Sequence, residues 1–283
     1  MNCMRRLCII LGWVPVLLLA DAKPDPKPTA VPRAAKAPVI DGRLDDPCWR
    51  QAARIQVRHP HDPKQAAPAV PAMTARVTWD TDYLYLAYDV TDTHLVALGT
   101  GRATGPAQNR RPQAVEYAPE KNLDLVEFFV ALDSHRFFWE IHHNAANHLN
   151  TLWIELPTAA QLAKIPKPGY RHIKFHRDRH LPDVGPRTLQ RATQLKPKTD
   201  GTPSTPNQSN DRDTGYTGEL RLPWRGLAPD RKTTPAAGTI LSLLAVQLNG
   251  VQGRAIYHSS GDGLPNLMYH YSAAHWPTFQ LTD

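Results

Sequence analysis

A glutamate stands in the middle of the largely apolar run LDLVEFFVALD, residues 123–133. Side chains alternate between the two faces of a β-strand, so Glu127 shares a face with Leu125, Phe129 and Ala131. Both faces of the run are mainly apolar, which predicts a strand that is covered on two sides. A carboxylate in that position needs hydrogen-bond donors, a metal ion or a polar ligand. Glu127 is therefore the first candidate for a functional residue.

A second acid, Glu140, lies in the next β-like run, RFFWEIHH, and could oppose Glu127 across neighbouring strands. Paired carboxylates of this kind carry out glycoside hydrolysis, so a hydrolase is one alternative. A simpler alternative is that Glu127 pairs with a basic neighbour such as Arg136. The chain has no nucleophile elbow, phosphate-binding glycine loop or zinc-protease motif, and we predict no catalytic residues.

Histidines raise the question of a metal site. His142 and His143 are adjacent, so on a strand they point to opposite faces and cannot share one ion without distortion. His172, His176 and His180 follow at four-residue spacings, which suit a helix, but the surrounding composition is typical of strands. We predict no metal site from these histidines.

The elements that must position these residues are strands. Apolar and β-branched runs recur between turn residues, and helix signals are poor. The runs lie at residues 75–80, 83–92, 136–143, 150–156, 216–224, 238–250 and 276–283. The first four form two hairpins, around 81–82 and 144–149. This pattern predicts an all-β fold, a two-sheet antiparallel β-sandwich, with a long irregular insertion at 157–213 that contains one strand, RHIKFHR.

Two N-terminal segments differ in composition from the rest of the chain. Residues 1–22 combine a basic start, fourteen apolar residues and the small-residue pattern ADA, which predicts a signal peptide cleaved near Ala22. The chain would then be secreted or periplasmic, without stable membrane insertion; a retained membrane anchor is the alternative. Residues 23–36 are rich in Pro and Lys and predict a tether, and residues 37–283 would form the sandwich.

The formal net charge is +7, which could suggest a nucleic-acid partner. The basic residues are concentrated at 163–180 and 187–199, inside the Pro-rich insertion, and they belong to no nucleic-acid-binding motif. We therefore predict that the protein does not bind nucleic acid and that these residues form a solvated loop.

Several runs, in order, resemble carbohydrate-binding modules of family 9. They are APVIDGRLDDPCWRQAARI at 37–55, the LDLVEFFVALD strand and the GYTGELRLPW block at 215–224. The resemblance covers most of residues 37–283 outside the insertion. It implies a sandwich that binds polysaccharide or oligosaccharide without cleaving it, next to secreted glycoside hydrolases in polysaccharide degradation.

The resemblance also implies site residues. Glu127 corresponds to a sugar-binding Glu of the family, and Gln247, two residues before Asn249, to a sugar-binding Gln. Lys121 stands where the family has a stacking Trp, with Tyr117 the nearest aromatic. The residues predicted to contact the saccharide are Glu127, Gln247, Asn249, Glu140, His142, Tyr117, Tyr269 and His270. Some members bind calcium through loop acids, so we predict no cofactor other than calcium, without placing it.

A further alternative comes from related sandwiches of the wider, DOMON-like fold group, which hold a b-type haem between Met and His ligands. Met73 and Met268 are the methionines that follow the predicted signal peptide, and His142 or His270 could partner Met268. A colourless purified protein would exclude this alternative.

Overall fold

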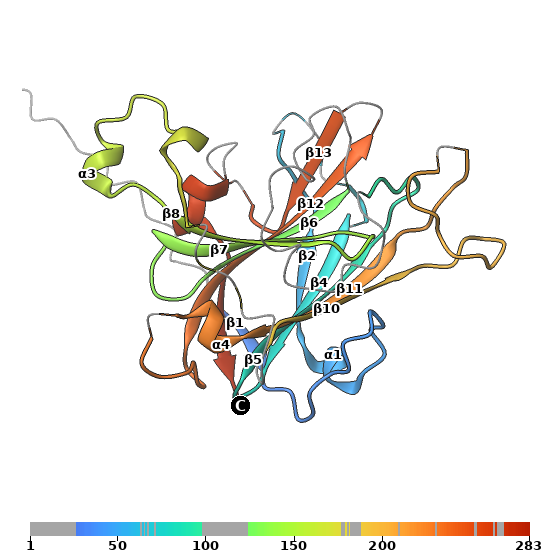
Figure 1. Ribbon diagram of the computed structural model, residues 1–283, viewed down its shortest axis with the longest axis horizontal. Helices are drawn as coiled ribbons and strands as arrows, with labels where there is room; N and C mark the ends of the chain where they lie inside the picture. Colours follow the sequence, from blue (N-terminus) through green and yellow to red (C-terminus); the bar gives the residue numbers. More distant parts are fainter. Residues whose placement is uncertain are drawn as a thin grey trace, which may run out of the picture.

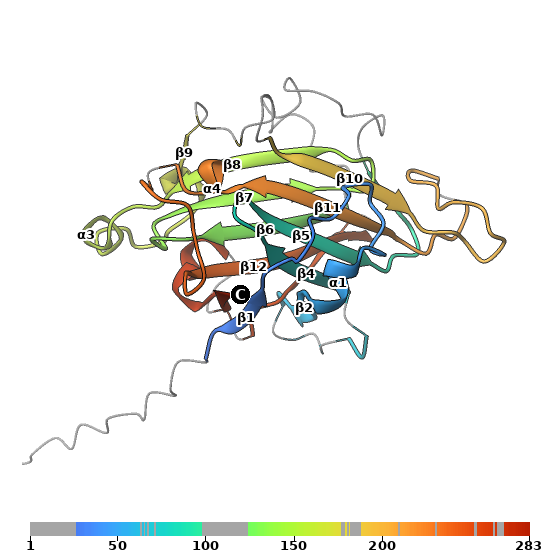
Figure 2. The same ribbon diagram turned by 90° about the horizontal axis from the view of Figure 1, so that it is seen from below.

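The computed structural model describes residues 27–97, 124–176, 188–251 and 254–283, with Arg179 and Leu181. Short gaps in these ranges fall at 63, 65, 67, 71, 209, 230, 263 and 265–268. Two β-sheets pack face to face, as both views show (Figure 1, Figure 2). The predicted all-β, two-sheet sandwich is confirmed. No helix within the described ranges is long and apolar enough to cross a bilayer.

The larger sheet, called the large sheet below, has the strand order β1-β14-β12-β6-β7-β8-β9, and β13 and β3 extend it from β12. Its strands are β1 (Thr29–Pro32), β3 (His59–Pro60), β6 (Leu125–Ala131), β7 (Phe137–His143), β8 (Leu149–Glu155), β9 (Lys174–His176), β12 (Ile240–Val251), β13 (Arg254–Ser259) and β14 (Thr278–Thr282). All of these pairs are antiparallel except β1 with β14, which run parallel.

The small sheet has the order β10-β11-β5-β4-β2 and is antiparallel throughout. Its strands are β2 (Ala53–Val57), β4 (Met73–Trp79), β5 (Tyr83–Val90), β10 (Gln190–Leu195) and β11 (Tyr216–Pro223). Helical elements are short: α1 (Pro47–Gln51), α3 (Ala159–Leu162), η2 (Tyr170–His172), α4 (Trp224–Leu227) and η3 (Tyr269–His275).

The main core lies between the sheets. β6 contributes Val126, Phe128 and Val130 to it, and we call this side of the large sheet the inner face. The alternate β6 residues Phe129 and Ala131 belong to a second cluster on the outer face. That cluster includes Trp276 and residues of η3, and the His270 ring of η3 packs against Phe129 of β6 and Phe138 of β7. β6 is thus covered on both faces, as its sequence predicted.

The turn at Gly42 and the helix α1 are anchored by a buried acid, Glu219. Glu219 of β11 has no exposed surface, and its carboxylate accepts hydrogen bonds from the Gly42 amide at 2.7 Å and the Trp49 indole at 2.7 Å. Gly42 has φ of 88°, and a Cβ there would lie 2.6 Å from the Thr193 backbone. Glycine is required at that turn because a side chain would be strained and would clash.

Two parts of the predicted organisation are corrected. Thr29–Pro32, inside the predicted tether, form β1, and Val31 is fully buried, so the sandwich begins before Ala37. The insertion supplies β9, inside the predicted RHIKFHR strand, and also β10, which the sequence analysis missed. β10 is a half-exposed edge strand whose sequence, QRATQL, lacks the apolar alternation on which the prediction depended.

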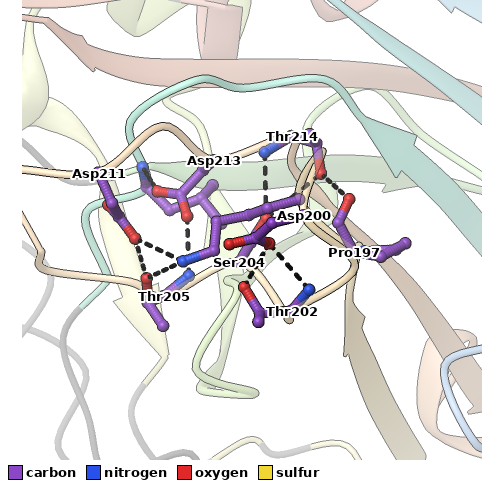
Figure 3. Close-up of polar contacts among 10 residues, drawn as sticks. Pro197, Asp200, Thr202, Ser204, Thr205, Asp211, Asp213 and Thr214 are labelled. Atoms are coloured by element: carbon purple, nitrogen blue, oxygen red, sulfur yellow. Dashed lines mark hydrogen bonds and ion pairs between the residues drawn. The ribbon is translucent and has the colours of Figure 1, made fainter.

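The β10–β11 connection is irregular but densely hydrogen-bonded (Figure 3). The Lys198 ammonium lies 3.0 Å from Asp211 Oδ2, and Asp213 accepts the Thr205 amide at 2.7 Å and the Leu95 amide at 2.8 Å. The charged groups of Lys198, Asp211 and Asp213 are therefore engaged in contacts within the protein. These contacts favour a structural role for this part of the insertion.

Candidate functional site

Three polar side chains meet on the outer face of the large sheet. Glu127 of β6 pairs in register with His142 of β7, and Glu140 lies two residues before His142, so all three share one face. Glu127 is 7% exposed, Glu140 1% and His142 0%. Regular ladder pairing of two central strands therefore creates a nearly buried polar group in an apolar surface.

The geometry of this group is tight. His142 Nε2 lies 2.8 Å from Glu140 Oε1 and 3.7 Å from Glu127 Oε1. The other oxygen of Glu140, Oε2, lies 2.8 Å from Nε2 of His270, which η3 supplies. Burial opposes ionisation of Glu140, but His270 and His142 outweigh it and hold the pKa of Glu140 below its usual value. Glu140 is therefore a carboxylate held between two imidazoles.

η3 is positioned by aromatic packing. The His270 ring meets Phe129 edge-on, with centroids 5.4 Å apart, and Trp276 packs at 5.0 Å from Phe138. The Trp276 indole also donates to the Tyr269 carbonyl at 3.1 Å, which closes the η3 segment on itself. These contacts fix His270 and Tyr269 over the centre of β6 and β7.

Further rings gather around the acids. The ring of His61 lies 4.9 Å from that of Tyr269 and 5.6 Å from that of Tyr257, while the Tyr170 ring lies 5.3 Å from that of His270. Burial raises the pKa of Tyr257 and Tyr269, and the nearby Glu127 raises it further. Their hydroxyls therefore stay protonated and able to donate. Tyr170 is 55% exposed, so this ring cluster reaches the surface.

Comparisons with known proteins agree with this architecture. Residues 40–136 match the family described as carbohydrate family 9 binding domain-like. A family 9 carbohydrate-binding module from Caldicellulosiruptor kristjanssonii, solved with cellotriose, superposes with a TM-score of 0.51 at 15% identity. That match covers 90% of this chain and 94% of the other. The chain has a CBM9-like fold, and residues 40–136 match the family model itself.

Two more structures share the fold. The Caldicellulosiruptor module solved with glucose gives a TM-score of 0.50 at 15% identity, covering 90% of this chain and 96% of that one. A Bacteroides uniformis protein gives 0.54 at 13% identity, covering 89% and 97%. No curated protein matches the chain.

Within this CBM9-like fold, five of the eight predicted contact residues come together. They are Glu127, Glu140, His142, Tyr269 and His270. Tyr117 lies outside the described residues. The alternative partner for Glu127, Arg136, instead pairs with Glu155 at 2.5 Å.

The positions of Gln247 and Asn249 correct the predicted set of contact residues, because they lie on the other face of the sheet from Glu127. Gln247 pairs with Val126 across β6, whereas it is Val246 that pairs with Glu127. Partners in register point to the same face, so Gln247 lies on the inner face with Val126, and Asn249, two residues on, points the same way. The two side chains therefore do not share the face that carries Glu127. A spacing in the sequence does not reveal this, because the strand register decides the face.

Three residues of the site were missed. Tyr257 lies on β13, Tyr170 on η2 in the insertion and His61 just after β3. Each belongs to a segment with no distinctive motif. Only the docking of these segments on the outer face brings their rings near Glu127.

The haem alternative, which pairs Met268 with His142 or His270, stays a prediction. Met73 is fully buried in β4, inside the core between the sheets, while His142 and His270 both contact Glu140 on the outer face. Met73 therefore lies on the wrong side of the large sheet to share an ion with either histidine. Met268 lies outside the described residues.

The calcium expectation can be compared with three neighbouring acids, Asp92, Asp124 and Asp213. Burial raises the pKa of Asp124 to about 8, and the neighbouring Asp92 adds to this. However, Asp124 accepts the Val96 and Gly250 amides, and both oxygens of Asp213 also accept amides. Calcium takes about six to eight oxygen ligands. Among the described atoms, only Asp92 Oδ2 of these acids has no hydrogen-bond partner, so these acids mainly anchor loops.

Proposed function

We propose that this protein binds saccharides without cleaving them, through the outer face of the large sheet around Glu127. The supporting observation is a carboxylate that is nearly buried on a rigid sheet beside His142, close enough to Tyr170, Tyr257 and Tyr269 for its charge to act on them. Sugars present C–H faces that stack on rings and hydroxyls that bind fixed acceptors. Glu127 would accept two adjacent hydroxyls, and the tyrosine hydroxyls would donate.

The similar modules from Caldicellulosiruptor were solved with cellotriose and with glucose. A glucose-type ring or a short β-glucan end is therefore the first ligand class to test. We propose export through residues 1–22 and a role beside secreted glycoside hydrolases in polysaccharide degradation.

The state of Glu140 supports a binding role over hydrolysis. A glycosidase needs one carboxylic acid that can protonate the leaving oxygen, and its pKa must be raised. Glu140 is instead held ionised by His142 and His270. Glu140 is therefore unsuited to the role of the acid in such a pair.

The test begins with a glycan array on the purified protein, followed by calorimetric titration with the best ligand, glucose and cellotriose. Glu127→Ala should keep the fold and lose measurable affinity. The matched control is Glu155→Ala, because Glu155 forms ion pairs on the same sheet beyond the ring cluster. Unchanged affinity in Glu127→Ala would remove Glu127 from the site. Sustained polysaccharide hydrolysis that Glu127→Gln or Glu140→Gln abolishes would overturn the non-catalytic role.

A further inference from the structure

The outer-face cluster has the composition of a transition-metal site. Glu127, Glu140 and His142 each offer a ligand atom, and these atoms all lie within 4.8 Å of one another. In a tetrahedral zinc site with bonds of about 2.0 to 2.1 Å, ligand atoms are roughly 3.3 Å apart. The measured separations of 2.8 Å and 3.7 Å from His142 Nε2 lie on either side of that value. Small side-chain rotations would place all three atoms around one ion.

The donor types select the class of ion. An imidazole nitrogen with two carboxylate oxygens suits zinc and neighbouring transition metals, whereas calcium and magnesium take oxygen ligands. The two strands that carry the ligands are central in the large sheet, and their register places Glu127 beside His142. Three protein ligands on a rigid sheet, with water as the fourth ligand, would complete a tetrahedral zinc site.

His270 supplies the support that such sites use. Carboxylates that bind metal are themselves held by hydrogen bonds from outside the ligand set. Here His142 contacts Oε1 of Glu140, and His270 contacts Oε2 of the same carboxylate. Glu140 is therefore fixed from behind by a residue whose own ring packs against Phe129.

The charge balance favours a cation at this point. Two carboxylates approach each other in a nearly buried setting, where uncompensated negative charge is costly. A divalent ion bound between the two carboxylates would supply that compensation.

We infer that Glu127, Glu140 and His142 bind a divalent transition-metal ion of the zinc type, with His270 as a positioning residue. This inference concerns the same face as the proposed saccharide site but does not depend on saccharide binding. The pattern of histidines alone predicted no metal site, because only one of them belongs to the ligand set and the other ligands are acids.

The experiment measures Zn²⁺ binding to the metal-stripped full-length chain at pH 8, by calorimetry and by metal analysis after dialysis. Wild type should bind about one ion per chain. Glu140→Gln and Glu127→Gln, which keep the side-chain shape, should each weaken binding by about 100-fold or more, and His270→Ala by roughly 10- to 100-fold. His176→Ala is the control, since His176 pairs with Glu155 away from the cluster, and it should stay within about twofold of wild type.

Circular dichroism confirms that each variant is folded, and Glu127→Gln keeps the test decisive if Glu140→Gln unfolds. Folded wild type that retains no Zn²⁺, or a loss in His176→Ala equal to that in Glu127→Gln, would overturn the inference. Saccharide titrations with excess chelator separate the two proposals. Sugar binding without Zn²⁺ binding rejects the metal site alone, and Zn²⁺ binding without sugar binding on the array rejects the proposed function alone.

Discussion

His142 and His143 are neighbours in β7, and both are fully buried, but they lie in opposite environments. His142 faces the carboxylates of Glu127 and Glu140 on the outer face. His143 points into the core between the sheets, where its Nδ1 lies 2.8 Å from the Tyr88 hydroxyl and its Nε2 2.8 Å from Asn147 Oδ1. The alternation of a strand thus gives two identical residues different chemistry.

The groups around each imidazole account for the difference between His142 and His143. Burial lowers the pKa of His143 to about 3, so its ring is neutral, donates to Asn147 and accepts from Tyr88. The outer face instead concentrates acids against imidazole, which suits cations and hydroxyl groups. The inner face is built for packing, and the outer face holds the polar groups that could bind a ligand.

The largest effect should come from breaking the outer-face network. Glu140→Ala removes the carboxylate that both His142 and His270 contact, and leaves two buried imidazoles without it. We expect a loss of about 3 to 5 kcal/mol in the free energy of unfolding, measured by denaturant titration. Glu155→Ala, which removes ion pairs near the surface, should cost less than about 1 kcal/mol. Equal losses in the two variants would contradict this picture.

The inner-face histidine predicts a pH dependence. The pKa of His143 is lowered in the folded state, so its contribution is complete above about pH 6.5 and is lost as the pH falls from there toward about 3. In that window the unfolded chain binds a proton that the folded chain does not. We expect the free energy of unfolding to fall by about 1.4 kcal/mol per pH unit from this residue.

Comparison with His143→Gln isolates the contribution of His143 to the pH dependence of stability, because glutamine keeps a donor and an acceptor but does not titrate. Denaturant titrations between pH 6 and pH 4 should give a shallower decline for the variant. Parallel declines would show that His143 is protonated in the folded protein.

The smallest effect should come from Gln247. It lies on the inner face, and its Oε1 has no hydrogen-bond partner among the described residues. Gln247→Leu should change stability by less than about 1 kcal/mol, because an unsatisfied buried polar atom is replaced by an apolar group. Saccharide affinity should not change in calorimetry. A loss of binding in this variant would place Gln247 at the ligand after all.

Much of the framework was predictable. The hairpins β4–β5 and β7–β8, and the strands β6, β11, β12 and β14, follow from apolar alternation and turn residues. Strand β10 was missed because an edge strand with polar side chains carries little periodic signal. β1 was missed because its four residues stand in a Pro-rich segment and gain their order from pairing with β14.

The candidate site was predictable only where a strand's own pattern was sufficient. Glu127 was identified because an acid in an apolar strand needs a partner, and the structure provides His142 across the ladder. Gln247 was predicted to contact the same saccharide as Glu127 but lies on the opposite face, since its orientation depends on which residue of β12 pairs with which residue of β6. The rings of Tyr170 and Tyr257 come from distant segments without a shared motif.

The amino-acid order by itself determined that this chain forms strands, and that one of them carries an acid on a face that must be covered. Both follow from local physics, the two-residue repeat of a strand and the cost of burying charge. Only the tertiary structure decided what surrounds that acid. Strand register and the docking of η2 and η3 bring Glu140, His142, His270 and the tyrosine rings around Glu127, and such long-range choices depend on the whole packed sandwich.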